Sequence, residues 1–400
     1  MMQRKLFLLA LLLVPARASS QTLFATRGLG VPLPATDARA SALGGVGVGL
    51  RGYSFSMENP AEAAGLLRRG ATATLMPSWN HVELDGESET IGGSRFPLIR
   101  VFYPVNPRVV ASLGYGAYLD QTWSVRFTGQ EVLGTDTVAT SDVVRSNGGI
   151  AQLRFGGSWM ATDRLALGLS IGMLSGNLDR SVRRTFSDSA TFEPFESRLR
   201  WAYRAPQVAF GARWDPTNRT RISASLSMAS KLKASAQDSV GEDREYGSSM
   251  KLTAGASAQV TPVLMATVGT SHQKYPEIAS DPVVGSTGST AGASTRSSSW
   301  LYGGGLEYSG LRSGNTVFPF RIGARYQQLP YAGAVEDAPT EFGIALGAGF
   351  ELSSDIGFPQ ALFNVSLERA HRDGLTSALR GDGLQERFWR MNMSVALFGR

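Results

Sequence analysis

The sequence predicts an all-β fold, a transmembrane antiparallel β-barrel of about 14 strands that follows an N-terminal hatch, or plug. Two observations support this prediction. After residue 70, about fourteen short segments alternate between apolar and polar residues, which is the period of a strand with one face in an apolar environment. Tight turns and long loops join these segments in alternation. Bacterial outer-membrane barrels have this asymmetry and an even number of strands.

Residues 1–18 are predicted to be a secretory signal peptide. Arg4 and Lys5 form its positively charged start, residues 6–14 its apolar stretch, and residues 16–18 a small-residue cleavage site. The apolar stretch is shorter than the roughly 20 residues that a membrane-spanning helix needs. We therefore expect an exported protein that resides, as a barrel, in the outer membrane of a Gram-negative-type cell.

Residues 19–70 do not alternate and are predicted to form the hatch. Their alanine, glycine and leucine content favours a packed plug, because a disordered tail would be more polar. Asn59 and Pro60 predict the start of a short helix, with Asn59 as its cap and Pro60 at the first helical position. Residues 47–52 fit the dinucleotide pattern G-x-G-x-x-G but lack the strand and helix around that motif. We therefore expect these glycines to allow close packing in the hatch.

The run Ala38–Leu66 resembles the N-terminal hatch of the FadL/TodX family of outer-membrane transport proteins, and PorV-type proteins share a similar opening. The matching positions are Asn59, Pro60 and Ala61, together with the small residues of 42–49. The resemblance implies fourteen strands after the hatch, and diffusion of hydrophobic molecules through the barrel wall. It also implies that Asn59, Pro60 and Ala61 are hatch or gating residues.

Residues 71–400 are predicted to form the barrel. In residues 151–159, for example, Leu153 and Phe155 share the apolar face, whereas Arg154 lies on the opposite face. An arginine at mid-strand costs about 2–4 kcal/mol when it faces lipid, so this parity assigns the side chain to the lumen. The same reasoning gives three polar residues predicted to face the lumen: Arg154, Arg321 and Arg325.

Three further expectations concern single strands and their ends. The parity of residues 109–119 places Leu119 on the outward face together with Leu113. The first strand, near 71–80, must pair with the last, near 387–398, because an unpaired edge in lipid would leave backbone groups unsatisfied. Tryptophans are expected to form belts at the headgroup levels: Trp159 and Trp214 at the periplasmic rim, and Trp79, Trp123 and Trp300 at the outer rim.

Catalytic and metal-binding chemistry is not expected. The chain has no cysteine, which excludes disulfides, Cys-ligated zinc and thiol nucleophiles. Its three histidines, His81, His272 and His371, are expected at loops or outer strand ends, without a nucleophile motif. We predict no catalytic residue, no metal and no cofactor. A barrel hydrolase that uses Ser271 with His272, or His371 with Asp373, is the enzymatic alternative.

The function expected from this resemblance is an outer-membrane channel for passive uptake of hydrophobic small molecules, either long-chain fatty acids or aromatic hydrocarbons, gated by the hatch. The formal charge of +6 falls to about +3 when Arg4, Lys5 and Arg17 leave with the signal peptide. The basic residues are scattered, so no nucleic-acid partner is expected. The expected partners are outer-membrane lipid, lipopolysaccharide and the hydrophobic ligand. The alternative function is a PorV-like scaffold for secreted or surface proteins, which would add a surface-protein partner.

Overall fold

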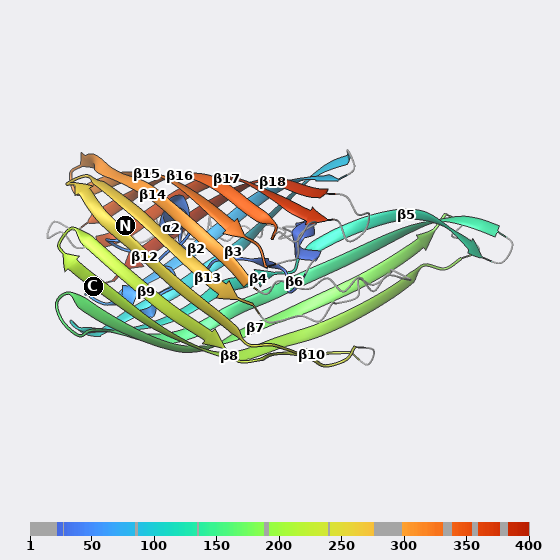
Figure 1. The fold of residues 1–400 in the computed structure, drawn as a ribbon, viewed down its shortest axis with the longest axis horizontal. Helices are drawn as coiled ribbons and strands as arrows, with labels where there is room; N and C mark the ends of the chain where they lie inside the picture. The colour runs from blue at the N-terminus through green and yellow to red at the C-terminus, as the bar shows by residue number, and fades with distance from the viewer. Residues whose placement is uncertain are drawn as a thin grey trace, which may run out of the picture.

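The computed structural model describes residues 22–26, 28–84, 87–133, 136–187, 192–238, 241–275, 298–330, 338–353, 359–376 and 383–399. These residues form a closed antiparallel barrel (Figure 1). In the described part of the chain, its wall consists of fourteen strands: β2 (Gly70–Leu84), β3 (Glu87–Asn106), β4 (Val109–Asp120), β6 (Asp136–Met160), β7 (Leu165–Phe186), β8 (Phe195–Thr217), β9 (Thr220–Ala229), β12 (Ser249–Thr261), β13 (Leu264–Lys274), β14 (Ser298–Ser313), β15 (Thr316–Gln328), β16 (Thr340–Ser353), β17 (Pro359–Thr376) and β18 (Gly383–Phe398).

The barrel closes where the last strand meets the first. β18 pairs antiparallel with β2, from Phe398 opposite Gly70 to Arg387 opposite His81. This pairing removes the open edge that lipid could not satisfy. The closed fourteen-strand barrel predicted from the sequence is therefore confirmed, whereas the predicted signal peptide, residues 1–18, lies outside the described residues.

The two faces of the wall differ in polarity, as the alternation predicted. Leu153 and Phe155 point outward, and Phe155 is 58% exposed. Gln152 and Arg154, on the other parity of the same strand, are buried inside. Large apolar side chains are exposed on the outer face all around the ring. An apolar surface of this extent needs an apolar solvent, and a lipid-facing band is the surface that transmembrane barrels present.

Two of the expectations for single residues were wrong. A β-bulge shifts the β4–β6 register between Ala117 and Leu119, so the parity inverts and Leu119 is buried, at 3% exposed, rather than facing lipid. Trp123 is also buried, because its strand leaves the membrane and packs its side chain near Phe24. The other four tryptophans that were expected in the belts are exposed outward: Trp79, Trp159, Trp214 and Trp300.

The two ends of the barrel have different lengths of connection. Turns of two to four residues close one end, at 107–108, 161–164, 218–219, 262–263 and 314–315. At the other end β6, β7 and β8 have 25, 22 and 23 residues, which at about 3.3 Å per residue is more than a membrane-spanning strand requires. These strands project far beyond the rest of the barrel (Figure 1).

The projecting part continues the sheet of the barrel wall, and we call it the outer sheet. It consists of the long ends of β6, β7 and β8 together with three short strands: β5 (Trp123–Leu133), β10 (Leu232–Ala236) and β11 (Arg244–Tyr246). β5 pairs with β6, and β10 pairs with both β8 and β11. The outer sheet therefore extends one side of the barrel wall into the aqueous phase.

Residues 22–26 and 28–69, the N-terminal segment, lie inside the ring. They contain two short 3-10 helices, η2 (Leu23–Thr26) and η3 (Pro60–Ala63), the strand β1 (Val31–Pro32) and the short α-helix α2 (Ala38–Ala42). β1 pairs with β4, α2 packs against β15–β18, and η3 packs against β6–β8. Among the described residues, no helix is long and apolar enough to cross a membrane.

A glycine of the predicted close-packing run is needed where the N-terminal segment approaches the wall. Gly49 has a φ of +75°, and a Cβ built on it would collide with the carbonyl of Gly255 in β12. Any other residue at position 49 would be strained in its backbone and blocked by that carbonyl. The glycines of residues 47–52 thus have a packing role.

Candidate functional site in the barrel lumen

Arginines of the wall hold the N-terminal segment by its backbone carbonyls. An irregular segment leaves carbonyl groups without partners, and a guanidinium offers five donors in a fixed geometry. Four buried or nearly buried arginines on β3, β6, β8 and β9 use this property: Arg100 donates to Ser56 at 2.6 Å, Arg154 to Met57 at 3.0 Å, Arg213 to Ala64 at 2.8 Å and Arg221 to Leu50 at 3.0 Å. The N-terminal segment is therefore bonded to a wide arc of the wall.

Arg154, one of the residues predicted to face the lumen, has a fully neutral set of hydrogen-bond partners. Besides the Met57 carbonyl, its guanidinium donates to the amide oxygen of Gln207 at 3.0 Å and to the hydroxyl of Ser227 at 2.9 Å. These three hydrogen bonds go to polar atoms of the wall or of the N-terminal segment, and the residue is 8% exposed. The residue thus lies in the lumen, as its parity predicted.

Asn59, Pro60 and Ala61 form a fixed point between the N-terminal segment and β8. Asn59 is fully buried and caps η3, because its Oδ1 accepts from the Ala61 amide at 2.8 Å. Its Nδ2 donates to the carbonyl of Ala212 at 3.1 Å, and a Cβ on the neighbouring Gly211 would collide with the Asn59 side chain. The capped helix start expected from the sequence is present. The gating role that the resemblance implied for these residues stays a prediction.

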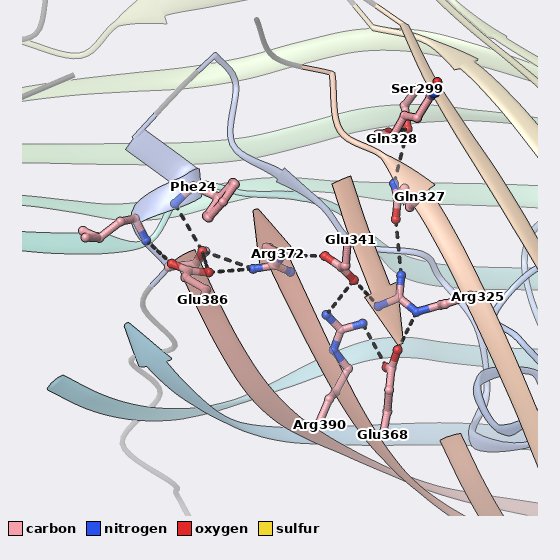
Figure 2. Close-up of polar contacts among 12 residues, drawn as sticks. Phe24, Ser299, Arg325, Gln327, Gln328, Glu341, Glu368, Arg372, Glu386 and Arg390 are labelled. Atoms are coloured by element: carbon pink, nitrogen blue, oxygen red, sulfur yellow. Dashed lines mark hydrogen bonds and ion pairs between the residues drawn. The ribbon is translucent and has the colours of Figure 1, made fainter. Parts of the chain in front are cut away.

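Six inward-facing charged side chains of β15–β18 form one continuous network, which we call the charge ladder (Figure 2). Three cations and three anions balance, and every side chain is at most 9% exposed. Buried charges persist in proteins only when they are paired and hydrogen-bonded. The members are Arg325, Glu341, Glu368, Arg372, Glu386 and Arg390.

The order of contacts in the charge ladder runs from the middle of the lumen towards its outer end. Arg325 donates to Glu368 at 2.5 Å and to Glu341, and Glu341 also accepts from Arg372. Arg372 then donates to Glu386 at 3.1 Å. Two of the predicted lumen residues, Arg321 and Arg325, therefore do lie inside, and both have carboxylate partners on neighbouring strands.

The outer end of the charge ladder binds the first residues of the N-terminal segment. Glu386 accepts from the hydroxyl of Thr22 at 2.6 Å and from the amide of Leu23 at 2.7 Å. Arg372 also donates to the Thr22 hydroxyl, at 3.1 Å. Glu386 is thus shared between the wall and the start of η2, as the dashed contacts in Figure 2 show.

A second ion-pair cluster fixes α2. Arg39 donates twice to Glu307 of β14, at 2.8 and 2.9 Å, and Glu307 also accepts from Arg321 at 2.6 Å. Burial by itself lowers the pKa of Arg39, but the Glu307 carboxylate outweighs it and raises the pKa above its ordinary value. Arg39 is therefore a permanent cation held at the wall, and α2 is attached by charge as well as by packing.

A small polar cavity lies beside the N-terminal segment. It has a volume of about 40 Å³, whereas an apolar cavity that binds benzene measures roughly 150 Å³. Its lining includes Arg154, Lys251, Glu58 and several serine and glutamine side chains. Lys251 and Glu58 form an ion pair at 2.5 Å. In this conformation the cavity is too small for an aromatic ring.

An apolar cluster adjoins this cavity on the side of the outer sheet. It contains Trp201 and Tyr203 of β8, Tyr246 of β11 and Leu29 of the N-terminal segment, all buried. Tyr118 and Tyr275 belong to both the cluster and the cavity lining. The lumen thus passes from aromatic near the outer sheet to polar further in.

The three histidines do not form a catalytic or metal-binding group. His81, His272 and His371 lie on three separate strands, β2, β13 and β17. Ser271 is buried on the face of β13 opposite His272, and the pair of His371 with Asp373, at 3.3 Å, is exposed. In the described ranges, no group of three His, Cys, Asp or Glu residues is placed to hold a metal ion.

Sequence reasoning missed most of the lumen residues described above. Arg100 lies on a segment whose alternation is blurred, and the carbonyl partners of Arg100 and Arg213 come from the N-terminal segment, far away in the sequence. A usable signal was present, because acidic and basic residues share the inward parity of the last four strands. Glu341 faces inward on β16, and Glu368 does so on β17.

The chain matches no protein-family model and no curated protein by sequence. Its fold is similar to that of several solved structures. A FadL homologue from Pseudomonas aeruginosa aligns with a TM-score of 0.62 and 16% identity, over 92% of this chain and 99% of that one. The toluene transporter TbuX from Ralstonia pickettii gives a TM-score of 0.54 and 14% identity, over 91% and 98% of the two chains.

The toluene transporter TodX from Pseudomonas putida is also similar, with a TM-score of 0.51 and 11% identity over 93% of this chain and 99% of that one. The predicted resemblance to FadL/TodX-type proteins is confirmed at the level of the fold. At 11–16% identity the likeness concerns architecture, and it assigns no ligand to this chain.

Proposed function

We propose that this protein is an outer-membrane channel for passive uptake of hydrophobic small molecules, with the N-terminal segment acting as its hatch. One observation carries the proposal. Within a closed barrel whose outer face is apolar, the N-terminal segment lies in the lumen and is bonded to wall strands on several sides. The solved structures of similar fold that are described as toluene transporters favour the same function.

The lining of the lumen favours one class of cargo. A solute entering from the outer sheet would first meet aromatic side chains and then the cavity with Arg154 and Lys251. An amphiphile with an apolar body and an anionic end matches this order. Its carboxylate could replace Glu58 as the partner of Lys251, or the Met57 carbonyl as a partner of Arg154. We therefore propose a long-chain fatty acid rather than an aromatic hydrocarbon as cargo.

A weak line in the wall supports lateral release of the cargo. The β2–β3 register shifts between Thr74 and Met76 and leaves Phe96 and Pro97 without partners. On the other side of β2, the described pairs with β18 stop at Leu75 and resume at Ser78. Proline cannot donate a ladder hydrogen bond, so pairing is interrupted on both sides of β2 here. We propose this line as the exit towards the membrane.

A second candidate function, a scaffold for surface proteins, is favoured by the outer sheet. Its strand β5 pairs with β6 along its length, and no pairing register joins its other edge to a described strand. A free strand edge can add a strand from another protein. Co-purification of a surface protein that depends on β5, together with no uptake, would favour this function over the channel.

A disulfide lock tests the hatch. The natural chain has no cysteine, so Ala38→Cys with Ser394→Cys introduces a single pair at a point where the Ala38 amide donates to the Ser394 hydroxyl at 2.7 Å. The measurement is influx of a fluorescent fatty acid into liposomes that contain the full-length protein. We expect influx to fall at least tenfold on oxidation and to recover on reduction.

The control pair is Ala348→Cys with Val365→Cys, which are partners within the wall itself. Oxidation of this pair should leave influx unchanged, because it crosslinks β16 to β17 without touching the N-terminal segment or the proposed exit at β2. Equal influx through the oxidised and reduced Ala38–Ser394 lock would disprove the hatch. Influx of toluene but not of the fatty acid would instead reverse the proposed cargo class.

A further inference from the structure

The apolar band on the outer face has a definite upper edge near the outer sheet. Along β8 the outward residues include Trp214, Phe210 and Pro206, followed by Arg204. Ten residues separate Trp214 from Arg204, or about 33 Å along the strand. A strand tilt of roughly 40° reduces this length to about 25 Å of height, which is the height of the lipid-facing band in such barrels. Arg204 therefore lies at the outer edge of the hydrocarbon.

Above this edge the outward side of the outer sheet is basic, and we call it the basic face. Pairing registers place its charged residues on the same side of the sheet as the lipid-facing residues below. Four carboxylates lie there: Asp179, Glu196, Asp243 and Glu245. Eight cations, all exposed, surround them: Arg126, Arg145, Arg183, Arg198, Arg200, Arg204, Lys231 and Lys233.

The carboxylates neutralise only three of the eight cations. Arg198 pairs with Glu196 at 2.9 Å, Arg200 with Asp179 at 3.2 Å, and Lys231 with Glu245 at 2.7 Å. The other cations have no ion pair with any carboxylate in the described ranges. These five are Arg126, Arg145, Arg183, Arg204 and Lys233.

Two of these cations face each other directly. Lys233 of β10 and Arg204 of β8 are opposite residues in the antiparallel ladder, and like charges in this position destabilise a sheet. In the next rows Arg145 lies one strand from Ser181 and two strands from Arg198, so the charges repeat about 10 Å apart. An anion between two such cations would replace repulsion by attraction.

The opposite side of the same sheet has another character. Val144 of β6, together with Trp201 and Tyr203 of β8, is buried towards the lumen entrance. The positive charge is therefore not a general property of the outer sheet. The lumen side does carry Arg180, Arg184 and Arg244, but Glu131 and Asp142 both pair with Arg184, so the larger excess of positive charge lies on the side that faces the neighbouring lipid.

We propose that the basic face binds the phosphate groups of lipopolysaccharide in the outer leaflet around the barrel. The basic face begins where the hydrocarbon ends, which is the level of lipid phosphates. Each Lys or Arg near an anionic membrane surface contributes about 1 kcal/mol of attraction, and arginine binds phosphate in a bidentate manner. This site is independent of cargo uptake, but it requires the long-strand end of the barrel to lie outside the cell.

The test compares lipid binding by variants of the full-length protein in detergent. The probe is bisphosphorylated lipid A, and native mass spectrometry measures its retention over a range of concentrations and salt. The variant is Arg145→Gln, Arg183→Gln, Arg204→Gln and Lys233→Gln combined. Because four cations are removed, we expect binding on the order of 1,000-fold weaker than that of the natural protein, and we expect added salt to weaken natural binding.

The matched control removes the same charge at the short-turn end: Arg108→Gln, Arg164→Gln, Arg219→Gln and Arg312→Gln, all exposed. It should bind lipid A as the natural protein does. Unchanged binding by the basic-face variant, or equal losses in both variants, would overturn the proposal. Normal lipid A binding by the basic-face variant with loss of a bound protein would overturn it in favour of a protein partner. Heat-dependent gel mobility verifies that both variants are folded barrels, and fatty-acid influx should be equal in both.

Discussion

Replacing Glu386 with glutamine should release the start of the N-terminal segment without opening the barrel. The Glu386 carboxylate accepts from Thr22, Leu23 and Arg372 at 2.6–3.1 Å. In the variant, the side-chain NH2 group replaces one of the two carboxylate oxygens, so at least one of these three donors loses its acceptor. The charge ladder also loses one negative charge and is left with a net positive charge. The Leu23 amide can still donate to the remaining oxygen, so part of the attachment survives.

The expected change in the free energy for release of residues 22–26 depends on which contacts remain in the variant. Removing one partner of a buried ion pair costs about 3–5 kcal/mol, but Arg372 keeps its contact with Glu341. Hydrogen bonds to charged groups contribute about 1.5–3 kcal/mol each. We therefore expect the release of residues 22–26 to become easier by about 2–3 kcal/mol, which corresponds to a roughly 30- to 150-fold larger open population.

Amide hydrogen exchange of the full-length protein, read by mass spectrometry, measures this population directly. The exchange of residues 22–26 should accelerate by the same factor of roughly 30 to 150. The matched control is Glu307→Gln, which should loosen α2 through Arg39 and leave residues 22–26 as protected as before. Unchanged exchange at residues 22–26 in a folded Glu386→Gln barrel would refute the role assigned to the charge ladder.

Three shorter predictions follow from other contacts. Phe155→Arg places a cation on the lipid face and should destabilise the barrel by about 2–4 kcal/mol in bilayer unfolding titrations, and an unchanged midpoint would contradict the assigned orientation of β6. Asn59→Ala removes the cap of η3 and the bond to Ala212, so exchange around residues 60–63 should accelerate roughly fivefold, for a loss of about 1 kcal/mol; protection equal to the natural protein would show that the cap is not needed. Arg39→Met leaves Glu307 with Arg321 alone, so protease cleavage near residues 38–42 should increase, and resistance to cleavage would argue that packing alone holds α2.

The sequence predicted the barrel because the alternation of apolar and polar residues within each strand reflects its two environments, lipid on one face and the lumen on the other. Alternation in a segment such as residues 151–159 requires no knowledge of its neighbours, and the cost of an arginine in lipid places Arg154 inside. The pairing of the first strand with the last was predicted from the cost of leaving a strand edge unpaired in lipid. The alternation gives the wrong face where one extra residue is inserted into a ladder, as between Ala117 and Leu119. Such a bulge depends on the register with β6, which one segment alone does not show.

The lumen contacts could not be predicted for a related reason. Arg39 and Glu307 are 268 positions apart, and Thr22 and Glu386 are 364 positions apart. Parity shows that a charged side chain points inward, but it does not show which strand stands across the ring. Only the register of all fourteen strands and the path of the N-terminal segment bring these partners together.

The enclosed position of the N-terminal segment restricts the order of events during biogenesis. These residues precede β2, and the seam between β2 and β18 joins the first wall strand to the last one synthesised. If β2 and β18 paired first, the N-terminal segment would have to enter the closed barrel through one of its ends and then bind the buried arginines of the wall. We therefore expect the N-terminal segment to pack against the sheet while the barrel is still open. The pairing of β2 with β18 then encloses it.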